Sequence, residues 1–339
     1  MGRRERQELI KAIEEERGSK LLVYITGDRR GLETRIAMDA FPFIFTHLSR
    51  MGRQEKIDLY LYSPGGITMA GYGLVNLIRE FCQSFNVIVP FKALSCATLI
   101  VLGADEVIMS KMGLLSPIDP SVTSPYGPRV PRPDIPGMEA LVPVNVEDAV
   151  SYLDLAKKEA GLKGEESLAK VFDKLSTNVP PLTLGAVNRA REQIRFLAKT
   201  LLSYHMKDEQ KIEKIVSVIT RERFSHEYLI GRREAKEVVR LNVIDVPEAL
   251  EQKIINLFSE YNNILNMNVP YNPEEVLGTQ SRAIGQFDRG IIESDSLTHV
   301  FRTRKDIRRV EVAQPGVPVP IIGYQERVLS ESWVEDNSI

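Results

Sequence analysis

Several features that often reveal a protein's compartment or cofactor are scarce in this chain of 339 residues. It has only two cysteines, Cys82 and Cys96, which are too few for a disulfide framework and fit a reducing compartment. No group of cysteines and histidines has the spacing of metal ligands, and we expect no metal and no cofactor. The longest apolar run, residues 93–104, is far shorter than the roughly 18–20 residues of a membrane span. No signal-peptide core is visible near the start. We therefore expect a cytoplasmic protein.

An excess of one charge is also missing. The chain has 44 basic and 46 acidic residues and a net charge of −2, so neither nucleic acid nor an anionic membrane is expected as its main partner. The basic pair Arg3 and Arg4 is followed by five glutamates within residues 5–16, and this stretch predicts a solvated helix.

Apolar runs alternate with segments of helical period between residues 21 and 109, and this alternation favours an α/β fold built from βαβ units. Strands are predicted at 21–26, 57–62, 86–93 and 106–109, with helices at 36–48, 69–81 and 95–103. Eight prolines between residues 117 and 143 exclude a regular helix or a central strand and predict a long loop. Further helices are predicted at 147–175, 184–206, 208–220 and 232–240, with a strand at 243–245.

The pattern weakens from about residue 272. We predict a helical arm over residues 1–20, an α/β domain over 21–275 and a C-terminal appendage over 276–339. The appendage contains too many apolar side chains for a solvated linker, so it should fold against the body or against a partner.

Two junctions from a strand into a helix carry the candidate chemistry. One passes through Ser-Pro-Gly-Gly at residues 63–66, and the other enters a helix at Ser95. Taken alone, the first junction predicts a tight turn supported by Gly65, and the second predicts an N-cap serine at the start of a helix. Together they place two amides, of Gly66 and of Cys96, where they could converge above Ser95 Oγ as an oxyanion hole, because the carboxyl ends of parallel strands meet at one edge.

The motifs resemble those of a known family. DLYLYSPGG and SCATLIVLGAD, with their spacing, are similar to the Clp peptidase and crotonase-like clan. With GLLSPIDP (113–120) and RFSHEYLIGRREA (223–235), the chain resembles the serine dehydrogenase proteinase family, a branch related to signal peptide peptidase A. The resemblance covers about residues 20–250 and, loosely, IIESDSLTHVFRTR (291–304). It implies a Clp/crotonase-like fold of repeated β-β-α and βαβ units over residues 21–275. It also implies a serine peptidase that forms a homo-oligomer.

The same resemblance implies the remaining site residues. Clp peptidases use a Ser-His-Asp order, whereas this chain has Asp119 where their histidine falls and His226 where their aspartate falls. The serine dehydrogenase proteinases are described with the order Ser, Asp, His, which this chain matches. One departure is that Arg240-Leu241-Asn242 stands where the clan usually ends a helix with glycine. Asn242 is therefore predicted to supply the left-handed helix stop.

Other residues stay open as candidates for the general base. His205 lies near a helix end, and Lys111 or Lys199 would make a Ser-Lys dyad like that of signal peptide peptidases. His47 and His299 are read as structural or exposed. The sequence predicts a cytoplasmic serine peptidase that acts through an acyl-enzyme on Ser95. The alternatives are a Ser-Lys peptidase, a non-proteolytic crotonase-like acyl-CoA enzyme or scaffold, or a pseudoenzyme. The sequence does not identify the peptide substrate, an ATPase partner or the number of subunits.

Overall fold

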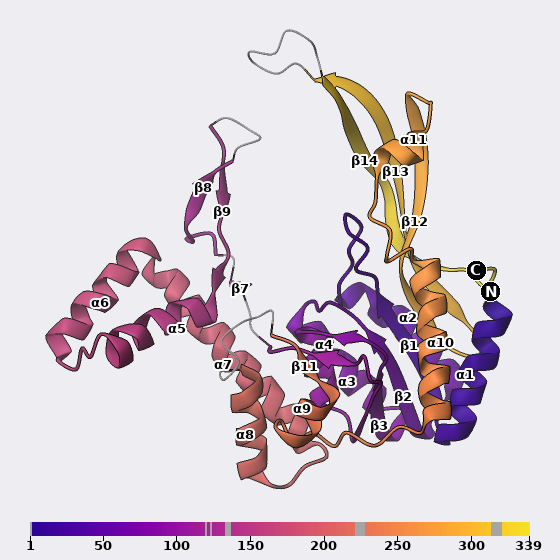
Figure 1. Ribbon diagram of the computed structural model, residues 1–339, viewed down its shortest axis with the longest axis horizontal. Helices are drawn as coiled ribbons and strands as arrows, with labels where there is room; N and C mark the ends of the chain where they lie inside the picture. The colour runs from indigo at the N-terminus through magenta and orange to yellow at the C-terminus, as the bar shows by residue number, and fades with distance from the viewer. Residues whose placement is uncertain (1, 119–120, 123, 133–136, 221–227, 313–320) are drawn as a thin grey trace. The chain divides into compact units, whose positions relative to one another are not determined.

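The computed structural model describes residues 2–118, 121–122, 124–132, 137–220, 228–312 and 321–339 (Figure 1). The chain forms two compact units, one of residues 1–115 with 230–339 and one of residues 116–229. The chain leaves the first unit after β6 (Leu114–Leu115) and returns at β11 (Ile230–Gly231), and these two strands pair antiparallel.

The first unit is built on a seven-stranded mixed sheet of order β14-β13-β12-β1-β2-β3-β5. Strands β1, β2, β3 and β5 are parallel, whereas β12 joins β1 antiparallel and continues through β13 to β14. The strands are β1 (Lys20–Thr26), β2 (Gln54–Tyr62), β3 (Cys82–Val89), β5 (Glu106–Met109), β12 (Arg282–Glu293), β13 (Thr298–Val312) and β14 (Ile321–Glu335). The predicted α/β class is therefore confirmed.

Helices cover both faces of this sheet, which explains why its central strands are apolar on both sides. Helices α1 (Arg3–Arg17) and α10 (Glu248–Ile264) lie side by side and pack against the face that carries Val23 and Ile25 (Figure 1). Tyr24 points to the opposite face and meets Trp333, which also contacts Phe43 of α2 (Phe41–Met51). Helices α3 (Thr68–Arg79) and α4 (Cys96–Leu102) follow α2 on that face.

Helix α1 exposes most of the glutamates that predicted a solvated helix, but its opposite side is buried. The side chain of Arg6 is fully buried and donates two hydrogen bonds, of 2.9 and 3.0 Å, to the buried carboxylate of Glu293 on β12. Tyr261 Oη and Thr298 Oγ1 donate to the same carboxylate at 2.7 and 2.8 Å. The sequence did not predict the burial of Arg6, because a charged residue can be buried when its partner is supplied from far along the chain, here 287 residues away.

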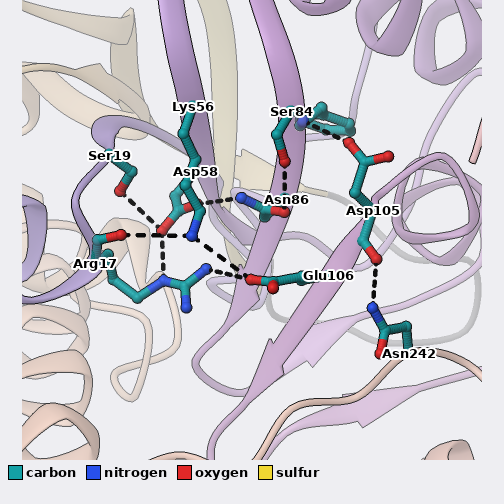
Figure 2. A network of polar contacts seen from close by, with 10 residues as sticks. Arg17, Ser19, Lys56, Asp58, Ser84, Asn86, Asp105, Glu106 and Asn242 are labelled. Carbon is teal, nitrogen blue, oxygen red and sulfur yellow. Dashed lines mark hydrogen bonds and ion pairs between the residues drawn. The ribbon is translucent and has the colours of Figure 1, made fainter.

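A second polar network fixes the other end of α1 to the parallel strands β2, β3 and β5 (Figure 2). Arg17 Nε donates to Asp58 on β2 at 2.8 Å, and Arg17 Nη2 donates to Glu106 on β5 at 2.9 Å. Asn86 on β3 donates to the other oxygen of Asp58 at 2.8 Å. Asp58 and Asn86 are fully buried, so these bonds replace the water that burial removes.

Most predicted elements of the first unit are present within a few residues of their expected ends. Helix α2 begins later than predicted, because a 3-10 helix (Met38–Ala40) precedes it and Pro42 occupies its first turn. The helix stop was wrong. Helix α9 (Arg232–Glu237) is followed by Arg240 with φ +70°, whereas Asn242 donates its side-chain amide to the carbonyl of Asp105. Helix α10 and the long strands β12 to β14 were not predicted.

The second unit is mainly helical. It contains α5 (Val146–Asp154), a π-helical turn (Leu155–Glu159), α6 (Glu165–Asn178), α7 (Pro181–Ser203) and α8 (Glu209–Thr220). The proline-rich segment forms short strands, β7 (Ser121–Val122), β8 (Arg129–Pro131), β9 (Glu139–Leu141) and β10 (Val144–Asn145), in two two-stranded sheets. No helix among the described residues of either unit is long and apolar enough to cross a membrane. The predicted boundaries at residues 20 and 275 stay predictions. The structure pairs the predicted appendage with β1 in the main sheet.

Two histidines far apart in the sequence form a buried pair in the first unit, as their structural reading suggested. His47 Nε2 lies 3.0 Å from His299 Nδ1, and His47 Nδ1 lies 2.8 Å from Ser294 Oγ. Burial lowers the pKa of His47 to about 3, and the neighbouring His299 and Arg50 add to this effect. The pKa of His299 is also lowered, mainly by burial. Both imidazoles are therefore neutral in the folded protein near neutral pH.

This pair predicts a loss of stability on mild acidification. The unfolded chain binds protons to these histidines below pH 6.5, whereas the folded chain does not, so the unfolding free energy should fall as the pH drops below 6.5. For His47 alone the loss between pH 7.5 and pH 5 should be about 2 kcal/mol. Urea unfolding followed by the fluorescence of Trp333, the only tryptophan, measures it.

In His47→Gln the pH dependence between 5 and 7.5 should shrink by about one proton, although the protein is less stable overall. Equal slopes in wild type and His47→Gln would contradict the assignment.

Candidate active site

Ser95 occupies the sharp turn between the short strand β4 (Lys92–Ala93) and α4. Its backbone has φ +52° and ψ −112°, and among the described residues other than glycine only Arg240 and Asn266 share a positive φ. Such a conformation costs about 1–3 kcal/mol and persists where the surrounding structure holds it, commonly at functional sites. The Ser95 side chain makes no capping bond to α4, so the N-cap interpretation does not explain the residue. Serine at a strained strand-to-helix turn is a known way to hold a nucleophile.

The two glycines of the Ser-Pro-Gly-Gly turn allow two close backbone approaches. Gly65 has φ +125°, and a Cβ there would lie 3.0 Å from Ser95 Cβ and 3.5 Å from Ser95 Oγ. Gly66 forms a parallel bridge with Ile36, and a Cβ at Gly66 would lie within 2.8 Å of Ile36 Cα and closer still to its N and O. Only glycine fits at either position, so the turn lies directly beside Ser95 because it has no side chains there.

The bridge to Ile36 also orients the amide of Gly66. Ile36 N–H donates to the carbonyl of Gly65 at 2.9 Å, and Ile67 N–H donates to the carbonyl of Ile36 at 2.8 Å. In an extended segment the alternate groups point to the opposite side, so Gly66 N–H faces away from Ile36. Within the part of the chain that the structure describes, neither Gly66 N–H nor Cys96 N–H donates a backbone hydrogen bond. These are the two amides predicted for the oxyanion hole, and their convergence on one point stays a prediction.

The sequence analysis missed two residues that hold this turn, Ser63 and Thr26. Both are buried, with 0% and 1% of their surface exposed. Thr26 Oγ1 donates to Ser63 Oγ at 2.6 Å, Ser63 Oγ accepts from Gly65 N–H at 3.0 Å and donates to the Gly65 carbonyl at 3.1 Å. The sequence does contain a signal for them, because each is a polar residue at the carboxyl end of an apolar strand. That signal is weaker than the adjacent pair of glycines.

Asp119 and His226, the two partners predicted for Ser95, lie outside the described residues. The described strands around them form one small sheet of order β11-β6-β4. Strand β4 ends two residues before Ser95, β6 ends four residues before Asp119, and β11 begins four residues after His226. Strand β6 is parallel to β4 and antiparallel to β11. The end of β4, the end of β6 and the start of β11 are therefore at the same edge of this sheet.

The competing lysines are both engaged in ion pairs. Lys111 Nζ lies 3.3 Å from Glu251, with 68% of its side chain exposed, and Lys199 Nζ pairs with Glu213. A dyad base must instead be neutral and desolvated. His205 is half-buried at the end of α7 in the second unit. Cys96 is no alternative nucleophile, because burial raises the pKa of its thiol to about 12.

Gly65 offers a test of the close approach to Ser95. In Gly65→Ala the new methyl group should displace Ser95 and slow its labelling by a fluorophosphonate at least tenfold. The control is Gly52→Ala, which also has a positive φ (+67°) but has nothing within 4 Å of the added methyl group. It should lose about 1–3 kcal/mol of stability, because its backbone conformation is one that only glycine adopts readily, and it should label like wild type. Similar labelling rates in both variants would contradict the proximity of Gly65 to Ser95.

Comparison with known proteins agrees with these motifs. Residues 2–135, less than half of the chain, match the family model described as ClpP-like SDH-type serine proteinase. The matched range contains Gly65, Gly66, Ser95 and Asp119 but not His226. Two proteins of Methanocaldococcus jannaschii are related in sequence. The uncharacterized protein MJ0137 is 25% identical over 62% of this chain and 59% of its own length, and the uncharacterized protein MJ1495 is 31% identical over 33% and 41%.

The chain thus spans less than two thirds of either relative. Among solved structures, a membrane-bound stomatin-specific protease has a TM-score of 0.38 and 14% identity, over 70% of this chain and 85% of its own. ClpP1 from Listeria monocytogenes has a TM-score of 0.36 and 14% identity, over 72% and 98%. The family match confirms the resemblance read from the motifs: over residues 2–135 this chain is similar to the ClpP-like SDH-type serine proteinases.

Proposed function

We propose that the protein is a serine peptidase that cleaves peptide bonds through an acyl-enzyme on Ser95. In this proposal His226 is the general base and Asp119 orients it. The amides of Gly66 and Cys96 form the oxyanion hole. The substrate is a protein or peptide and no cofactor takes part.

One observation carries the proposal, the shared edge of the small sheet β11-β6-β4. Ser95 and Asp119 follow the ends of two parallel strands, and His226 precedes the start of a strand antiparallel to them. The carboxyl ends of neighbouring parallel strands meet at one edge of a sheet, where residues far apart in a sequence commonly come to share a site. This arrangement supports the exchanged order of the triad, because a triad is defined by geometry and not by sequence order.

The chemistry that follows is acyl transfer in two steps. Ser95 Oγ attacks the peptide carbonyl carbon while His226 takes the hydroxyl proton, and the carbonyl oxygen becomes an oxyanion held by two N–H groups. The C–N bond then breaks, and His226 gives its proton to the leaving amine. A water molecule attacks the ester, His226 takes one of its protons, and the carboxylic acid leaves as Ser95 recovers its hydrogen.

A crotonase-like acyl-CoA enzyme remains the second candidate, because two backbone amides can stabilise a thioester oxyanion equally well. The strained backbone of Ser95 favours the peptidase. A strained backbone would serve no purpose at a residue that merely lines a pocket, whereas backbone strain that presents a nucleophile is part of the mechanism. We also propose that the protein acts in the cytoplasm as a homo-oligomer, as the family resemblance implies.

Ser95→Ala should abolish both peptidase activity and labelling by a fluorophosphonate. The fold should survive, because Ser95 makes no capping bond that alanine would lose. Circular dichroism and the thermal midpoint check the fold, and mass spectrometry of the labelled peptide locates the probe. A peptidase activity that persists in Ser95→Ala would rule out this residue as the nucleophile.

The base is identified by comparing labelling rates of five variants. His226→Ala should be nearly as slow as Ser95→Ala, because members of a triad act as a unit, and Asp119→Asn should be somewhat less affected. Lys111→Ala, Lys199→Ala and His205→Ala should stay within about tenfold of wild type, because the lysines are already paired with carboxylates. A dead lysine variant together with an active His226→Ala would instead identify a Ser-Lys enzyme.

A further inference from the structure

We propose that Ser63 and Thr26 are positioning residues of the oxyanion hole, which fix the peptide plane that carries Gly66 N–H. The proposal rests on the proposed peptidase function and adds two residues to it. Neither residue touches the reacting atoms in this account, and both act through the backbone of Gly65.

The hydroxyl of Ser63 is saturated. A serine hydroxyl has one proton and two lone pairs. Its lone pairs accept from Thr26 Oγ1 at 2.6 Å and from Gly65 N–H at 3.0 Å, and its proton goes to the Gly65 carbonyl at 3.1 Å. Because Thr26 donates, the Ser63 proton is left for Gly65. Both side chains are buried, so water is not at hand to replace either hydroxyl.

These bonds determine where Gly66 N–H points. The Gly65 carbonyl and the Gly66 N–H belong to one planar, trans peptide unit, so they point in opposite directions. The Gly65 carbonyl accepts two hydrogen bonds, from Ser63 Oγ at 3.1 Å and from Ile36 N–H at 2.9 Å. Two donors on one end of the unit hold the other end in place. This matters here because both flanking residues are glycines, whose backbones would otherwise rotate freely.

The same bonds strengthen the donor. Hydrogen bonds accepted by a carbonyl polarise its peptide unit, and chains of such bonds reinforce each other in a buried environment. The sequence Thr26, Ser63, Gly65 carbonyl, Gly66 N–H is such a chain. Its effect should therefore appear when negative charge develops on the reacting oxygen and should be small when the ligand only binds.

The experiment measures inactivation by a fluorophosphonate, whose phosphoryl oxygen gains negative charge as Ser95 attacks. We expect Ser63→Ala to lower the maximal rate of inactivation roughly tenfold to a hundredfold, less than the loss of a whole oxyanion donor. Its half-saturating concentration should change less than threefold. Thr26→Val, which removes the hydroxyl but keeps the shape, should lower the rate roughly threefold to tenfold. Thr26→Ser, which keeps the hydroxyl, should recover most of that loss.

Ser110→Ala is the matched control. Ser110 is also fully buried, and its hydroxyl donates to the Pro90 carbonyl at 2.6 Å and accepts from Met112 N–H at 3.0 Å. It should lose stability as Ser63→Ala does but should inactivate at the wild-type rate. The pH at which the rate reaches half its maximum should be the same in all variants, because none of them changes the general base. The double variant Thr26→Val/Ser63→Ala should be no slower than Ser63→Ala, because both changes break the same chain.

The outcomes separate the two proposals. If wild type reacts at Ser95 but Ser63→Ala and Thr26→Val react as fast as Ser110→Ala, the positioning role is wrong and the peptidase proposal stands. If Ser63→Ala does not fold, the Thr26→Val and Thr26→Ser pair decides in its place, and equal rates in that pair overturn the role. If wild type does not react at Ser95, the proposed function fails and the positioning role fails with it.

Discussion

One buried carboxylate, that of Glu293, ties the first unit together. An ionised carboxylate in a protein interior is tolerated only when nearly every lone pair is satisfied, and Arg6, Tyr261 and Thr298 together supply four hydrogen bonds to it. These residues come from α1, α10 and the start of β13. The charge can therefore be buried only when both helices and the strands β12 and β13 are in place, so one ion pair couples elements that are nearly 290 residues apart.

The sheet that this ion pair supports is connected to the candidate site by hydrogen bonds at the ends of β1 and β2. Strand β1 lies between β12 and β2, and its last residue, Thr26, contacts Ser63 at the end of β2. Ser63 contacts Gly65, which lies against Ser95. Ser63 N–H also donates to the carbonyl of Lys92, and Leu94 N–H donates to the carbonyl of Ser63, so the strand before Ser95 is held by the same residue. The position of the candidate nucleophile is thus set by backbone contacts between neighbouring strand ends.

The sequence predicted those parts of the structure whose signals are local. The strands β1, β2, β3 and β5 and the helices between them follow from apolar periodicity. The Ser-Pro-Gly-Gly turn follows from its two adjacent glycines, which indicate a close approach between backbone segments. Strands β12 and β13 were missed because charged residues interrupt their apolar pattern, at four of the 12 positions of β12 and seven of the 15 positions of β13. Arg302 and Arg282, for instance, pair with Asp288 and Asp306 on the neighbouring strand, and such pairing does not show as an apolar pattern. Ser63 and Thr26 were missed because their role depends on a contact across 37 residues.

The antiparallel attachment of β12 to β1 has a consequence for the order of folding. Strand β1 ends at residue 26 and its antiparallel partner β12 begins at residue 282, so one edge of an apolar strand must wait for more than 250 residues to be translated. Contacts of such long sequence separation form slowly, and an open strand edge attracts other chains in the meantime. Nascent chains that stop before β12 should therefore be the species most prone to aggregate, because helix α1 can shield a face of β1 but not its edge.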